Sequence, residues 1–394
     1  MFYKFAISML CLLMLTGCWS RRELNELLIV LGVGVDWEDG HYLVSYQVVN
    51  PSEISNQQKR GDRPPSTIFQ GRGRTLFEAA RSVTAEAPRK VYMGHLQIYV
   101  IGEEAARKKG INELIDSAAR DNETRMDFNI IVAKGSKAEE VLKLYTPVEK
   151  LPSYSMQQSL QTSQKNWAPT IAVTLDEAIT KLSSQGSELA LTGIRVIGNP
   201  KVGETKQNIE KFMPPSRFRY SGIAAFKDDK LIGWLNERES RGYTDITNNL
   251  DSTSIAVPCG EQRYLGIEVT SSDSKIKTKV VNGNPEAEVS IRTEANIVER
   301  SCTHVDLSNP ATIKELEGQT KKAIQSNAEA AVNHAKDMKA DIFGFGTQME
   351  KEHPAFWYKV KDQWRDEYFP KLKVSYKIKL YIRETGTTEN STIR

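Results

Sequence analysis

The chain has 394 residues, 39% of them hydrophobic and 26% charged, a composition typical of a folded protein of two or three domains. Its 53 lysine and arginine residues nearly balance 50 acidic ones. The resulting net charge of +3 argues against a dedicated nucleic-acid-binding protein, which would carry concentrated basic charge.

The chain begins with the pattern of a secretion signal. Lys4 precedes an apolar run over residues 5–15, which is too short to span a bilayer because spanning requires about 20 apolar residues. The sequence Leu-Thr-Gly-Cys that ends at Cys18 has the form of a bacterial lipobox. It predicts removal of a signal peptide, residues 1–17, and lipid attachment at Cys18. An ordinary cleaved signal with an incidental cysteine and an uncleaved anchor are the alternatives.

Lipidation at Cys18 would tether the rest of the chain to the outer face of the cytoplasmic membrane. No second apolar run in the sequence approaches transmembrane length. Two further cysteines, Cys259 and Cys302, then lie in an oxidising compartment, which favours a disulfide between them. Two separate buried thiols are the alternative that the sequence leaves open.

Residues 18–200 alternate strand and helix patterns and are predicted to form an N-terminal α/β domain. Strands are predicted over residues 28–36, 42–49, 68–71, 90–102, 127–133 and 189–197. Helices are predicted over residues 75–87, 103–117 and 137–144, with helical pieces within 153–184. Thr75 and Glu78 have the spacing of a capping box at the start of the first helix.

The charged segment 201–215, which ends in prolines, is the best candidate for a domain boundary. It opens a middle region or small domain, residues 201–257, with a hairpin of strands at 220–226 and 231–235. Residues 258–385 are predicted to form a C-terminal α+β domain, and residues 386–394 a polar tail. The predicted fold class is therefore α+β, with three domains of mixed sheets and packed helices after a cleaved lipoprotein signal.

Within the C-terminal region, alternating patterns predict strands over residues 255–259, 266–271, 274–281, 286–298 and 372–382. The clearest helix covers residues 310–338, with Asn309 or Ser308 as its cap and Pro310 in its first turn. Its narrow alanine-rich stripe indicates that it lies against a sheet. Lysines alternate with apolar residues over 371–379, as in an edge strand protected from aggregation.

The sequence does not supply the parts of a catalytic or metal site. The five histidines are scattered, and neither a GxSxG nucleophile elbow nor a P-loop is present. We therefore expect no enzyme activity, no cofactor and no metal. His95 is interpreted as a structural, hydrogen-bonding histidine rather than a ligand. Four aromatic residues in a predicted helix over 354–368 are interpreted as core packing rather than a membrane or peptide surface: Phe356, Trp357, Tyr358 and Trp364.

Six short motifs occur in an order that resembles one family. They are Cys18-Trp19-Ser20-Arg21-Arg22-Glu23-Leu24, Gly71-Arg72-Gly73-Arg74-Thr75, Gly94-His95-Leu96-Gln97, the charged run from Arg120 to Arg125, Gly233-Trp234-Leu235, and Ala340-Asp341-Ile342-Phe343-Gly344-Phe345-Gly346. The family is that of the Ger(x)C lipoproteins, the C subunits of spore germinant receptors in endospore-forming bacteria. Each motif alone is weak, but their joint order is specific, and the resemblance covers nearly the whole chain.

The resemblance implies a three-domain α+β fold without known catalysis. It also implies a receptor of three kinds of subunit, two of them integral to the inner spore membrane and this one lipid-anchored on its outer face. Nutrients trigger such a receptor, and recognition of the nutrient is placed on the membrane subunits. The main alternative is a solute-binding lipoprotein that itself captures the nutrient, which would usually show two similar lobes joined by a hinge. A secreted hydrolase is a third hypothesis.

Overall fold

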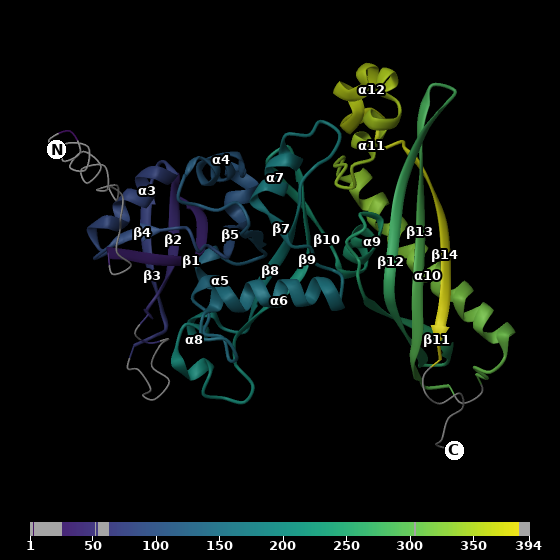
Figure 1. The fold of residues 1–394 in the computed structure, drawn as a ribbon, viewed down its shortest axis with the longest axis horizontal. Coiled ribbons are helices and arrows are strands. Elements are labelled where there is room, and N and C mark those ends of the chain that lie inside the picture. Colours follow the sequence, from purple (N-terminus) through teal and green to yellow (C-terminus); the bar gives the residue numbers. More distant parts are fainter. Residues whose placement is uncertain (1–2, 4–25, 52, 54–62, 303–304, 386–394) are drawn as a thin grey trace.

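The structure, a computed structural model, describes residues 3, 26–51, 53, 63–302 and 305–385. The predicted signal peptide, Cys18 and the tail 386–394 lie outside the described residues. Strands of the described part form two mixed sheets, one of ten strands and one of four, with helices packed on both (Figure 1). The predicted α+β class is confirmed.

The ten-stranded sheet occupies the N-terminal half of the chain, in the order β10-β9-β8-β6-β5-β1-β2-β3, with β4 paired to β1 and β7 to β6. Its strands are β1 (Leu27–Glu38), β2 (His41–Val49), β3 (Ser66–Gly73), β4 (Lys90–Tyr92), β5 (Ile98–Gly102), β6 (Asn129–Ala133), β7 (Val173–Thr174), β8 (Ala190–Ile197), β9 (Arg217–Lys227) and β10 (Lys230–Leu235). Strands β1, β5, β6 and β8 are parallel neighbours, and every residue of β5 and β6 is buried. Burial on both faces explains their continuous apolar sequences.

Helices cover both faces of this sheet (Figure 1). One core contains side chains of α3, α4 and α7, and the core on the other face contains those of α5 and α6. The helices and helical turns are α3 (Leu76–Ser82), η2 (Val83–Ala85), η3 (Ala105–Lys109), α4 (Asn112–Arg120), α5 (Ala138–Leu142), α6 (Pro152–Asn166), α7 (Leu175–Leu182), α8 (Pro200–Gly203) and η4 (Lys206–Asn208). Thr75 caps α3 as predicted, because its Oγ1 accepts a hydrogen bond from Glu78 N, but Glu78 Oε2 accepts its bond from Arg74 N, one residue before the cap, rather than from Thr75 N as a capping box requires.

The single strand predicted over 90–102 is wrong. Strand β4 pairs with β1 up to Ile29↔Tyr92, and β5 resumes at Gly32↔Ile98. Between these two pairs, β1 advances by three residues, whereas the segment from β4 to β5 advances by six. The extra residues between β4 and β5 are not paired with β1 and form a turn. This turn contains the motif Gly94-His95-Leu96-Gln97.

The hairpin predicted in the middle region is present, but it belongs to the large sheet. Strand β9 pairs antiparallel with β8, the last central strand, and β10 completes the edge. Besides most of α8 and η4, the segment 201–257 contributes α9 (Glu237–Ile246) and most of β11 (Thr253–Gly260), and β11 belongs to the other sheet. The described structure therefore differs from a separate small domain over 201–257, because the apolar strands of that segment complete sheets on either side.

The four-stranded sheet has the order β11-β12-β13-β14. Strand β12 (Arg263–Val281) is a single strand of 19 residues, although two strands are predicted there, and it pairs with β13 (Asn284–Arg300). A register shift lies between Val269 and Ser271, within the first predicted strand, and the pairing continues through the predicted gap at 272–273. Strand β14 (Lys373–Glu384) pairs parallel with β13 and lies at the edge, as its lysine alternation predicts.

Between β13 and β14 the chain forms α10 (Pro310–Asp337), α11 (Phe345–Glu352), α12 (Pro354–Val360), η5 (Lys361–Gln363) and η6 (Trp364–Tyr368). Asn309 caps α10 by accepting a hydrogen bond from Ala311 N, 2.9 Å away, and α10 packs against the four-stranded sheet, as predicted. The helix predicted over 354–368 is instead divided into α12 and two short turns. Trp357 and Trp364 are buried, which confirms their core role, whereas Tyr358 is exposed.

Candidate functional site

The junction between the two sheets is a continuous apolar core. It includes Ile223 of β9, Val289 of β13 and Ala335 of α10. Helix α9 packs closely on α10, because Gly242 lies against the backbone of Asn327, where an added Cβ would stand 2.1 Å from the Asn327 carbonyl oxygen. The two halves are therefore packed against each other rather than joined by a linker alone.

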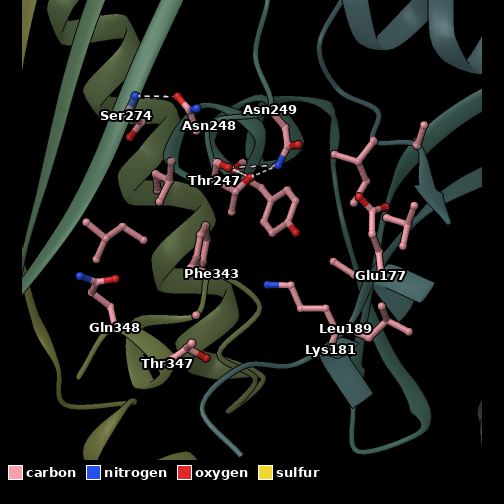
Figure 2. A pocket seen from close by; sticks show the side chains of 18 of the residues that line it. Glu177, Lys181, Leu189, Thr247, Asn248, Asn249, Ser274, Phe343, Thr347 and Gln348 are labelled. Carbon is pink, nitrogen blue, oxygen red and sulfur yellow. Dashed lines mark hydrogen bonds between the residues drawn. The ribbon is translucent and has the colours of Figure 1, made fainter. Parts of the chain in front are cut away.

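A cleft of about 410 Å³ opens at this junction (Figure 2). Its walls come from α7 and the segment before it, β8, the end of α9 with the loop that follows, β12, and α11 with the loop before it. The polar side chains that line it are those of Glu177, Lys181, Tyr243, Thr247, Asn248, Asn249, Ser274, Thr347, Gln348 and Lys351. A site built from five separate segments has no local sequence signature.

Lys181 is the charged group that extends into the middle of the cleft in Figure 2. Burial lowers the pKa of its ammonium group, although the carboxylates of Asp341 and Glu177 act in the opposite direction. Within the described residues, the structure gives this ammonium no hydrogen bond and no ion pair. The cleft therefore offers a cation with free donors, and a small polar or anionic molecule matches that chemistry.

The rim of the cleft beside α9 is fixed by its own hydrogen bonds. Asn248, which has φ of +59°, accepts a bond from Ser274 N at 2.8 Å. Asn249 Nδ2 donates to Thr247 Oγ1 at 2.9 Å. Asn248 therefore holds the loop against β12, and Asn249 fixes the conformation of the loop itself. In the described part of the chain, no cluster of three His, Cys, Asp or Glu side chains could hold a metal ion.

The motif Ala340-Asp341-Ile342-Phe343-Gly344-Phe345-Gly346 forms the base of the junction, and Asp341 organises it. Its buried carboxylate accepts hydrogen bonds from the backbone N–H groups of Gly344, Phe345 and Gly346 at 2.7 to 3.1 Å. It also accepts one from Trp364 Nε1 at 2.9 Å. Burial raises the Asp341 pKa, and the four donors act against that shift. Gly344, with φ of +82°, supplies the left-handed conformation at the N-cap of α11.

The same motif docks the C-terminal half onto the large sheet. The Asp341 carbonyl oxygen accepts a hydrogen bond from Glu188 N at 2.8 Å, just before β8. Thr347 N donates to the Gly186 carbonyl oxygen at 2.9 Å. This motif, one of the six that carry the family resemblance, thus connects the N-terminal and C-terminal halves of the structure through hydrogen bonds.

A charge cluster around the buried Glu188 forms a second contact between the two halves, at the β9–β10 turn. Glu188 is paired with Arg365 of η6, whose Nε lies 2.6 Å from Glu188 Oε1. The other Glu188 oxygen accepts a hydrogen bond from Asp228 N at 2.9 Å, and Asp228 also pairs with Arg365. Burial raises the pKa of Glu188 to about 7, although Arg365 acts in the opposite direction. Sequence analysis missed this cluster because its members lie far apart along the chain.

Glu188 should make stability depend on pH. Because its pKa is raised in the folded state, the folded chain keeps a proton that the unfolded chain loses, so the free energy of unfolding should fall as pH rises from 4.5 to about 7. Glu188→Gln should reduce the difference in unfolding free energy between about pH 5 and about pH 8, measured by denaturant titration. Glu367→Gln, at an exposed position of η6, is the control. An unchanged pH dependence in Glu188→Gln would contradict the assignment.

Cys259 of β11 and Cys302, which follows β13, are joined by a disulfide in the structure, with Cα atoms 6.2 Å apart. The bond links the strands on either side of β12 and closes a loop with a sequence separation of 43. Reduction should lower the free energy of unfolding by about 4 kcal/mol through restored chain entropy. Peptide mapping without reduction should recover the linked pair; two alkylatable thiols in the folded protein would contradict the bond.

Two further predictions from the sequence have different outcomes. His95 is exposed, and its ring lies 6.0 Å from that of Tyr92, so its interpretation as a hydrogen-bonded structural histidine is not supported. The charged run from Arg120 to Arg125, for which the sequence leaves a solvated helix end or a salt-bridged loop open, forms the ion pairs Arg120–Asp116 and Arg125–Asp127. Among the helices of the described residues, each is too short or too polar to cross a bilayer.

Comparison with known proteins supports a single identity along the chain. The family model for the spore germination protein N-terminal domain matches residues 20–196. The model described as spore germination B3/GerAC like, C-terminal, matches residues 221–386. The segment between them, residues 197–220, holds α8, η4 and the start of β9.

Full-length relatives agree with both matches. The chain is 29% identical to spore germination protein KC of Bacillus subtilis (strain 168), over 98% of this chain and 96% of that protein. It is 23% identical to spore germination protein B3 of the same strain, with 98% of each covered. The crystal structure of the GerBC protein has the same fold, with a TM-score of 0.54 at 18% identity, covering 89% of this chain and 96% of that one. The chain therefore belongs to the Ger(x)C family of spore germination proteins.

Proposed function

We propose that this chain is the lipid-anchored subunit of a nutrient germinant receptor, held at the outer face of the membrane through Cys18. Its homologues support a role in spore germinant receptors. The observation that carries the finer proposal is the Leu-Thr-Gly-Cys sequence at Cys18, which opens a chain related to this family along its length. The chain acts by assembling with integral membrane subunits.

The spacing between Cys18 and the fold suits this role. Eight residues separate Cys18 from Leu27, the first residue of β1. Fully extended, they reach at most about 28 Å. A lipid on Cys18 thus keeps the folded part close to the bilayer, where membrane-embedded partners meet it at high effective concentration.

The proposal is tested by purifying a tagged chain from spore membranes after crosslinking. The integral receptor subunits should co-purify, and crosslinked peptides should map the surface that they contact. A matched preparation from spores that lack those subunits is the control. Recovery of the chain without any receptor subunit would contradict assembly.

A second candidate function, direct capture of the nutrient, is favoured by the cleft that presents Lys181. The fold argues against it, because the sheets of ten and four strands are not the similar lobes of a solute-binding lipoprotein. Calorimetry with the cognate nutrient separates the two functions. Saturable binding that Lys181→Met removes would favour capture, and no binding would favour a subunit that acts by assembly alone.

A further inference from the structure

Two neighbouring loops below the large sheet carry large apolar side chains that face solvent. Val148 in one loop is 87% exposed, and Phe212 and Met213 in the other are 113% and 72% exposed. Ile209 is also exposed. These four residues form the apolar tip. Figure 1 shows the second loop, with α8, projecting beyond the sheet at the lower edge of the view.

Hydrogen bonds of a buried asparagine join the two loops that carry the apolar tip. Asn208 is buried, and its Nδ2 donates hydrogen bonds to the carbonyl oxygens of Tyr145 and Ser216 at 2.9 and 2.8 Å. Its Oδ1 accepts a bond from Ser216 N at 2.9 Å, and Tyr145 N donates to the Gly203 carbonyl oxygen at 2.9 Å. One buried amide therefore ties the two loops together at their base.

The charges around the apolar tip favour an anionic surface. The two loops and the start of β9 carry five basic side chains against three acidic ones. They are Lys150, Lys201, Lys206, Lys211 and Arg217, with Glu149, Glu204 and Glu210. Basic groups beside a small apolar cluster are typical of segments that lie in the headgroup region of a membrane.

The loop that carries the apolar tip also approaches the edge of the sheet at which β1 begins. Close to the start of β1, Val30 pairs with Val48, and the next residue of β2, Val49, pairs with Ser66 of β3. Ser66 and Glu204 line one surface cavity. The loop that carries the tip therefore reaches, at Glu204, the same edge of the sheet at which β1 begins. A tether of at most about 28 Å can bring both to one bilayer.

We propose that the apolar tip inserts shallowly into the lipid surface beside the anchor, as a second membrane contact that orients the chain. The inference rests on the proposed anchoring at Cys18 for the presence of that surface. A protein partner is disfavoured because a stable interface covers roughly 800 Å² on each side, whereas four side chains on projecting loops form a small convex surface. A lipid interface accepts such a surface without complementary shape.

Vesicle binding tests the inference without the anchor. The mature chain with Cys18→Ser should sediment with vesicles of phosphatidylglycerol and phosphatidylethanolamine. Phe212→Ser with Met213→Ser should weaken that binding about tenfold or more, because the inserted apolar area is removed. Phe77→Ser, which removes an exposed phenylalanine from α3, away from the tip, should leave binding unchanged. Circular dichroism of each variant establishes that the fold is retained.

Equal binding of the double variant and the unsubstituted chain would overturn the inference, as would no binding by either. Crosslinks from position 213 to a receptor subunit in place of lipid would also overturn it and assign the tip to a protein partner. Anchoring is measured separately, by the mass of the amino-terminal peptide from spore membranes. An unmodified Cys18 would contradict the proposed function while leaving the vesicle result intact.

Discussion

Replacing Cys18 with alanine should release the chain from the membrane and abolish or strongly slow nutrient-triggered germination while leaving its fold intact. The described sheets begin at Leu27, so the substitution leaves the sequence of every described strand unchanged. A single acyl chain gives a protein only marginal binding to a membrane, with an association constant of about 10⁴ M⁻¹. The two or three acyl chains expected on a lipoprotein cysteine anchor it stably. Loss of the anchor therefore removes the high effective concentration beside the membrane subunits.

Detergent phase partition and membrane fractionation measure the release, and germination assays measure the response to nutrient. Ser20→Ala, two residues away, keeps the cysteine and should remain anchored and active. Triggers that bypass the receptor should still germinate the Cys18→Ala spores, which separates a receptor defect from a general one. A full nutrient response with the chain in the soluble fraction would make the lipid dispensable.

Local features of the fold could be predicted from the sequence because short-range chemistry determines them. Thr75 and Glu78 lie three residues apart, and Asn309 directly precedes Pro310, so each helix start is encoded within one turn. Strand boundaries depend on the partner strand instead. The break between Tyr92 and Ile98 exists because β1 advances by fewer residues, and no pattern within 90–102 encodes that difference.

The candidate site was less predictable for the same reason. The motif around Asp341 was visible in the sequence, but its partners Glu188 and Trp364 lie 153 and 23 residues away. Lys181 follows the apolar stripe of α7 and resembles an ordinary surface lysine until α11 and the loop after α9 enclose it. Resemblance identified the family, whereas the pairing of distant segments determines what each residue does.

Replacing Asp341 with alanine should have the largest effect on stability, lowering the free energy of unfolding by about 3–5 kcal/mol. The carboxylate satisfies three backbone N–H groups and Trp364 Nε1, all in a buried setting. Alanine would leave these four donors without their acceptor, and each buried unsatisfied donor is costly. The turn before α11 would also lose its anchor, and the Glu188 contact made by the Asp341 carbonyl depends on that turn.

Denaturant unfolding followed by tryptophan fluorescence reports this loss, since Trp357 and Trp364 lie in the affected core. Asp362→Ala is the control. It removes a carboxylate of the same type from an exposed position of η5 and should change the free energy of unfolding by less than about 0.5 kcal/mol. Limited proteolysis should cut the Asp341→Ala chain faster between the halves, because the interlock with β8 is weakened. Wild-type stability with wild-type protease resistance would show that Asp341 does not hold the two halves together.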